Sequence, residues 1–85
     1  MEIIVTVPEY LDEGLKLDWE DGFEIESKVI NGEIMISANK AGLISLAKHL
    51  LTLAQDNVPA NHHFHLDECN GLEEGSNPLV IQKKG

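Results

Sequence analysis

The clearest pattern along the chain is a strict alternation of apolar and charged residues. It is strict through residues 15–20 and continues through residues 23–29, where Phe23, Ile25 and Val29 are separated by Glu24, Glu26 and Lys28. Side chains of successive strand residues point to opposite faces, so this alternation is typical of strands that bury one face. The two runs therefore predict neighbouring strands with a shared apolar face.

The connection between these runs is Glu20-Asp21-Gly22. A two-residue Asp-Gly turn would pair Glu20 with Phe23 and mix polar with apolar positions. A three-residue loop pairs Trp19 with Phe23 and keeps the apolar set on one face, with Gly22 in the left-handed conformation that such a loop requires. We therefore expect the three-residue loop. Trp19 is then expected in the core, and a binding anchor at the sheet edge is the alternative.

Asn31-Gly32 is the stronger hairpin signal, since both residues tolerate the positive φ angles of a two-residue turn. That turn predicts a definite register between the strands on either side of it. The expected pairs are Ile30 with Glu33, Val29 with Ile34, Ser27 with Ile36 and Ile25 with Ala38. The apolar face should then continue over three strands, through Leu15, Leu17, Trp19, Phe23, Ile25, Val29, Ile34, Ile36 and Ala38.

A helix is predicted after Asn39, which is a favourable N-cap residue, and should end near Asp56-Asn57. Its apolar stripe is expected to pack on the sheet. The stripe consists of Leu43, Leu46, Ala47, Leu50 and Ala54, widened by Ile44, Leu51 and Leu53. The opposite, solvent-facing side is expected to hold Lys40, Ser45, Lys48, His49, Thr52 and Gln55.

Three further strands complete the expected fold. They are residues 2–7, which stop at Pro8, residues 61–67 and residues 79–82. The prediction is one α+β domain over residues 1–85, with an antiparallel sheet of five or six strands, one amphipathic helix on one face and the order β-β-β-β-α-β-β.

Charge narrows the possible partners. Fifteen acidic residues stand against six lysines and no arginine, which gives a net charge of −9. A nucleic-acid binder needs a basic surface, so that class is disfavoured. Residues 1–26 alone hold nine acids and one lysine. The acidic residues around the first hairpin are predicted to bind a basic partner, and a merely solvated surface is the alternative. They are Asp12, Glu13, Asp18, Glu20, Asp21, Glu24 and Glu26.

Few residues in the sequence are candidates for metal binding or catalysis. His63, His65 and Asp67 should project from one strand face, where a zinc ion is one possibility and a polar face without metal is the other. Ser37, Ser76 and Cys69 lack neighbours that would mark them as activated nucleophiles, so we do not expect an enzyme. A single cysteine, no apolar run long enough for a membrane span and no basic leader favour a cytoplasmic protein without membrane contact.

The stretch of residues 63–76, HFHLDECNGLEEGS, resembles the C-terminal signature of a family of small immunity proteins from bacterial polymorphic-toxin systems. The resemblance implies a cytoplasmic protein that binds and neutralises one cognate toxin. Many such toxins are nucleases with basic active-site clefts, which an acidic partner could occlude. Two alternatives stay open: a small metal-binding protein that uses the histidines, and a homodimer that forms through an uncovered strand edge.

Overall fold

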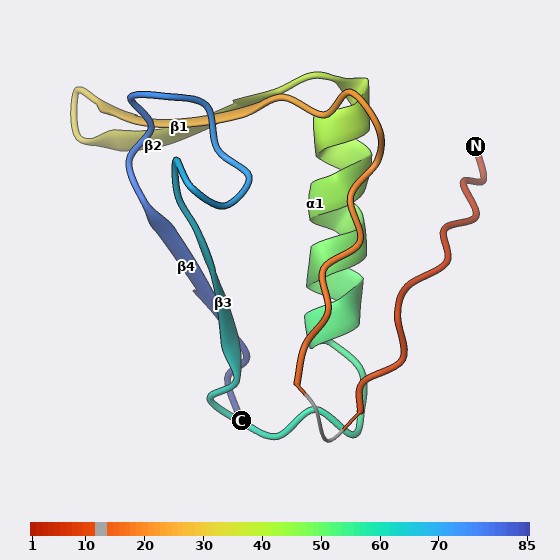
Figure 1. Ribbon diagram of the computed structural model, residues 1–85. Coiled ribbons are helices and arrows are strands. Elements are labelled where there is room, and N and C mark those ends of the chain that lie inside the picture. The colour runs from red at the N-terminus through yellow and green to blue at the C-terminus, as the bar shows by residue number, and fades with distance from the viewer. Residues whose placement is uncertain (12–13) are drawn as a thin grey trace.

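The computed structural model describes residues 1–11 and 14–85, and its elements follow the order β-β-α-β-β. The elements are β1 (Ile25–Ile30), β2 (Glu33–Ala38), α1 (Lys40–Leu53), β3 (His63–Leu66) and β4 (Leu79–Gln82). β1 pairs with β2 and β3 pairs with β4, both antiparallel. In Figure 1 the β1–β2 hairpin projects sideways from the top of α1. β3 and β4 lie below the hairpin and run alongside the helix.

The first hairpin confirms the predicted register in every pair. Ile30 lies opposite Glu33, Val29 opposite Ile34, Ser27 opposite Ile36 and Ile25 opposite Ala38. Asn31 and Gly32 have φ angles of 52° and 79°, as a two-residue hairpin turn requires. The apolar face that this register creates is buried only at its base. Ile25 is buried, whereas Val29 is 57% exposed and Ile34 is 71% exposed.

The expected sheet of five or six strands is wrong, because the described residues form two separate two-stranded sheets. Neither residues 2–7 nor residues 15–20 form a strand. The predicted three-residue loop is wrong, because Phe23 N donates to Glu20 O at 3.3 Å and thereby closes a two-residue turn at Asp21-Gly22. Gly22 has the predicted positive φ angle, 77°, and the Trp19 and Phe23 rings stack with centroids 4.5 Å apart.

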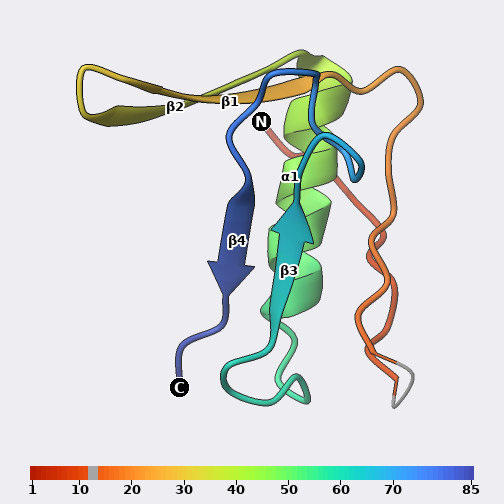
Figure 2. The same cartoon turned by 60° about the vertical axis from the view of Figure 1, so that its left-hand side comes forward.

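The N-terminal segment, residues 8–11 and 14–20, lies beside α1 instead of pairing with β1, and Figures 1 and 2 show residues 14–20 running along the helix. Polar side chains of the helix and its C-terminal end hold its backbone. Ser45 Oγ accepts a hydrogen bond from Glu20 N at 2.9 Å. Gln55 bonds the backbone twice, by accepting from Tyr10 N at 3.1 Å and donating to Pro8 O at 2.9 Å. An extended segment outside a sheet needs such partners for its buried amide groups.

The predicted orientation of the helix is therefore wrong, although its N-cap is confirmed. Asn39 Oδ1 accepts from Gly42 N at 2.8 Å. The buried helix residues are Gly42, Ser45, Lys48, His49, Thr52 and Leu53. Most of the predicted apolar stripe faces outwards, with Leu43 56%, Leu50 48% and Leu51 49% exposed. The polar side of α1 is buried because the N-terminal segment lies against it, where Ser45 bonds the backbone and Lys48 contacts Asp18.

The core lies between α1, the N-terminal segment and β3–β4. Its buried apolar residues are Ile25, Leu53, Val58, Phe64, Leu66 and Leu72, and Trp19 packs against them, as predicted. Trp19 meets the His49 ring edge to face at 4.3 Å, and its indole lies against Gly71. The alternation of β3 is confirmed, since Phe64 and Leu66 are buried and His63 and His65 are exposed.

The loop between β3 and β4 joins the two sheets. Glu73 N donates to Ile25 O at 2.8 Å and Asn77 N donates to Ser27 O at 2.7 Å. Ser76 Oγ accepts from Ser27 N at 3.2 Å. These bonds cover the outer edge of β1, which would otherwise present unpaired backbone groups. Among the described residues, no helix has both the length and the apolar character to cross a membrane.

Replacement of Gly71 by alanine should destabilise the fold more than the same change at Gly75. Both glycines have positive φ angles, 92° and 84°, so both variants carry backbone strain. A methyl group at Gly71 would also collide with the Trp19 indole, whereas at Gly75 it would meet only the mobile end of Lys28. We expect Gly71→Ala to lose about 1–3 kcal/mol more than Gly75→Ala in urea unfolding. Equal losses would contradict the close packing of Trp19 on Gly71.

Candidate partner-binding surface

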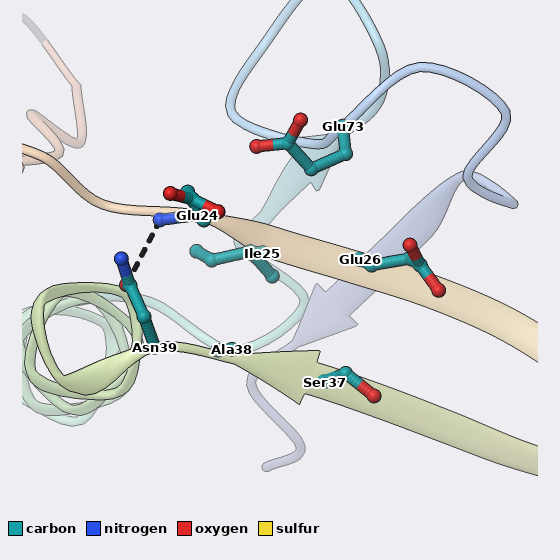
Figure 3. Close-up of a pocket in the computed structure, with 7 residues that line it drawn as sticks. All are labelled: Glu24, Ile25, Glu26, Ser37, Ala38, Asn39 and Glu73. Carbon is teal, nitrogen blue, oxygen red and sulfur yellow. Dashed lines mark hydrogen bonds between the residues drawn. The ribbon is translucent and has the colours of Figure 1, made fainter.

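Three carboxylates gather where β1 meets the loop after β3. Glu24 and Glu26 flank Ile25, and Glu73 reaches the same place from the loop. They border a shallow pocket of about 270 Å³ whose remaining lining is Ile25, Ser37, Ala38 and Asn39. Figure 3 shows the Glu73 side chain on the far side of β1, directed towards Glu24. We call Glu24, Glu26 and Glu73 the acidic cluster.

Asn39 fixes one end of this cluster. Its Oδ1 accepts from Glu24 N at 3.0 Å, the contact dashed in Figure 3. Its Nδ2 donates to Gly22 O at 2.9 Å, and Asn39 N donates to Glu24 O at 3.1 Å. Gly42 must lack a side chain here because a Cβ atom would collide with Glu24 O. The helix N-terminus therefore holds the backbone of Glu24 closely.

The electrostatics of the acidic cluster favour a cationic ligand. Glu24 and Glu73 are exposed, Glu26 is half-buried, and none of the three carboxylates has an ion-pair or hydrogen-bond partner within residues 1–11 and 14–85. Like charges gathered in one place repel each other, and a lysine or arginine from a partner would relieve that repulsion.

The seven acidic residues singled out in the sequence do not all lie in this cluster. Asp18 and Glu20 approach Lys48 Nζ on α1, at 2.5 Å and 3.5 Å. The hydrogen bond to Asp18 raises the pKa of Lys48 above its ordinary value. Asp21 lies in the exposed turn, whereas Asp12 and Glu13 fall outside the described residues. Asp18 and Glu20 are thus partly neutralised within the chain.

Glu73 is the cluster residue that sequence reasoning missed. It is far from β1 along the chain, and no periodicity connects the two. Only the hydrogen bond from Glu73 N to Ile25 O brings it beside Glu24. The run Glu73-Glu74 marks a local excess of negative charge in the sequence, but it gives no sign of the neighbour.

His49 lies in the core. Its side chain is fully buried between Trp19 and Phe64, and its two ring nitrogens have no hydrogen-bond partner among the described residues. Burial lowers the pKa of His49 to about 4, and the positive charge of Lys48 contributes to the shift. His49 is therefore a neutral core residue at physiological pH.

The histidines on β3 do not assemble a metal centre. The rings of His63 and His65 lie 4.9 Å apart at a steep angle, and His63 Nδ1 contacts Asn61 O at 3.1 Å. Asp67 Oδ1 accepts from Cys69 N at 2.9 Å. Outside residues 12 and 13, no group of three or more His, Cys, Asp or Glu residues is arranged to hold a metal ion. The metal-binding alternative therefore has no assembled ligand set here.

The possible nucleophiles named from the sequence lie in three different surroundings. Ser76 Oγ is engaged with Ser27 N, and Ser37 lies on β2, where it lines the acidic pocket. Cys69 is a free, exposed thiol in the loop after β3. Its pocket neighbours include Asp67, Glu68 and Ser76, and no histidine lines that pocket.

A model of the family described as immunity protein 32 matches residues 33–84, which is more than half of the chain. The chain belongs to the immunity protein 32 family. This confirms the resemblance to immunity proteins at the level of the family. No curated protein and no solved structure matches the chain.

The matched region covers β2, α1, β3 and β4, and therefore contains Glu73. The β1 strand and the N-terminal segment precede it, and with them Glu24 and Glu26. The acidic cluster is thus assembled from both parts of this immunity-family chain. The strongly acidic first third of the sequence lies outside the match.

The burial of His49 predicts a pH dependence of stability. The pKa is about 4 in the folded state against an ordinary value of 6.5, so the unfolded chain binds the proton more tightly. The free energy of unfolding that depends on neutral His49 is fully present above pH 6.5 and is lost as the pH falls towards 4. The loss should amount to at most roughly 3 kcal/mol.

Urea unfolding between pH 4 and 7 measures this effect. His49→Leu should flatten the dependence over this interval because it removes the titrating group from the core. His63→Leu is the matched control, since it removes an exposed histidine and should keep the wild-type slope. An unchanged slope in His49→Leu would contradict the assignment.

Proposed function

We propose that this member of the immunity protein 32 family binds a cognate bacterial toxin and neutralises it by stoichiometric blockade. The family match carries the proposal, because immunity is what the family is named for. The contact is assigned to the acidic cluster, Glu24, Glu26 and Glu73, which would meet a basic active-site cleft of the toxin.

The charge of the chain supports this contact. A net charge of −9 steers a basic partner towards the protein over long range, and the cluster offers carboxylates that are not neutralised within the described chain. Such complementarity mainly raises the association rate and the specificity. Asp21 extends the negative surface from its exposed turn, and Asp12 and Glu13 belong to the same acidic stretch of the sequence.

Asp18 and Glu20 have a secondary role in this proposal. Because they already contact Lys48, a toxin would have to compete for them or share them. In this proposal the protein acts without catalysis and resides in the cytoplasm, and the resemblance to polymorphic-toxin immunity proteins supports both points.

The double charge reversal Glu24→Lys with Glu26→Lys should weaken toxin binding by at least about tenfold, or about 1.4 kcal/mol, because attraction becomes repulsion. The measurement is titration calorimetry with the toxin domain encoded beside the immunity gene. The matched control is Glu2→Lys with Glu9→Lys, which changes the net charge equally on the N-terminal segment and should bind nearly as well as the wild type.

Circular dichroism should show both double variants folded. Equal weakening in the two would mean that only net charge matters, and this would contradict the assignment to the cluster. Glu73→Gln alone should weaken toxin binding by a smaller factor. If this variant binds the toxin with wild-type affinity, Glu73 does not belong to the contact. Failure of the wild-type protein to protect cells from the adjacent toxin would contradict the proposed function itself.

A further inference from the structure

The two edges of the β1–β2 hairpin differ in their hydrogen bonding. The loop after β3 pairs the outer edge of β1 through Glu73, Ser76 and Asn77. β2 has β1 on one side, and the described residues provide no strand or loop on the other. An unpaired edge presents a row of backbone donors and acceptors that can pair with another strand.

The backbone groups at this open edge belong to Ile34 and Ile36. Asn39 N donates to Glu24 O across the hairpin, so this opposed pair occupies a hydrogen-bonded position of the ladder. Hydrogen-bonded and non-bonded pairs alternate in an antiparallel ladder, which makes the pairs of Glu33, Met35 and Ser37 bonded ones. The N–H and C=O groups of Ile34 and Ile36 therefore point away from β1, towards the open edge.

The side chains around this edge are also unusually exposed. Ile34 is 71%, Met35 49% and Ile36 44% exposed, and Val29 beside them is 57% exposed. Figures 1 and 2 show the hairpin projecting away from the rest of the molecule. A two-stranded ribbon with an exposed apolar face is only marginally stable, and two more strands would complete a sheet.

We infer that β2 pairs antiparallel with β2 of a second copy of the chain, with Met35 opposite Met35 on the two-fold axis. This register places Ile34 of each copy opposite Ile36 of the other, so that their outward backbone groups meet in hydrogen-bonded pairs. Glu33 falls opposite Ser37, and no like charges face each other. The result is a continuous sheet of four strands in the order β1-β2-β2-β1.

Charge and sequence favour a second copy over a strand of another protein. The hairpin Ile25–Ala38 holds two glutamates and one lysine, a net of −1, against −9 for the chain, so self-association meets little local repulsion. The Ile34-Met35-Ile36 segment is also its own complement about Met35. A contact between two identical copies across a two-fold axis requires this property, whereas pairing with a strand of another protein does not require it.

Cysteine cross-linking tests the register. In a Cys69→Ser background, Met35→Cys places two thiols on the axis in a non-bonded pair, where the Cα atoms are about 4.5 Å apart and a disulfide can form. Ser37→Cys is the matched control, since Ser37 faces Glu33 in this register. Mild oxidation should yield covalent dimers of Met35→Cys only. Cross-linking of both variants, or of neither, would overturn the proposal.

A proline tests the edge independently. Ile36→Pro removes the outward N–H and the side chain, whereas Ile36→Ala removes the side chain alone. Light scattering over a dilution series measures the association. Wild type and Ile36→Ala should both form the two-chain species, and Ile36→Ala should dissociate at a higher protein concentration than the wild type. Ile36→Pro should have the mass of one chain and an unchanged circular dichroism spectrum.

Two results would overturn the self-pairing. One is a wild-type protein that has the mass of one chain at every concentration. The other is a monomeric wild type whose toxin binding is lost in Ile36→Pro and kept in Ile36→Ala, which would assign the edge to a strand of the toxin instead. Loss of toxin binding in the charge-reversal variants has no bearing on the edge, so the two proposals fail separately.

Discussion

The fold depends on the hydrogen bonds that hold the backbone of the N-terminal segment to α1 and to the turn that follows it. Ser45 and Gln55 bond Glu20, Tyr10 and Pro8, and these bonds keep the segment against the helix although it belongs to no sheet. The segment carries Trp19 into the core, where it contacts His49 and Gly71. Without these bonds, its buried amide groups would lose water without replacement, at a cost of about 1–3 kcal/mol each.

The same constraint explains which parts of the fold could be predicted. The Asn31-Gly32 turn, the strand register on either side of it and the Asn39 N-cap depend on local chemistry, and all three are confirmed. The orientation of α1 depends on what covers it. The usual rule assigns apolar residues to the core, but here Ser45 and His49 are completely buried and Leu43 is exposed. No periodicity in the sequence shows that an extended segment will require polar partners.

The arrangement of the acidic residues could be predicted only in part, for the same reason. Glu24 and Glu26 could be identified because they flank the apolar positions of a regular strand. Their neighbour Glu73 depends on a long-range backbone pairing, and the engagement of Asp18 by Lys48 depends on the buried polar side of α1. Sequence reasoning could therefore locate the excess charge, but it could not separate the free carboxylates from those that stabilise the fold.

The two proposed contacts use opposite edges of one hairpin, and this has a geometric consequence. The three carboxylates of the acidic cluster lie on the β1 side of the hairpin, whose edge the loop carrying Glu73 has closed to strand pairing, and the pocket beside them extends to Ser37 and Ala38 of β2. The proposed self-pairing uses the β2 edge. A two-fold axis perpendicular to the joined sheet keeps each face on its own side, so the Glu26 side chains of the two copies would be on the same face, separated by all four strands. Self-pairing would thus leave both acidic clusters accessible, and a dimer could engage two toxin molecules at once.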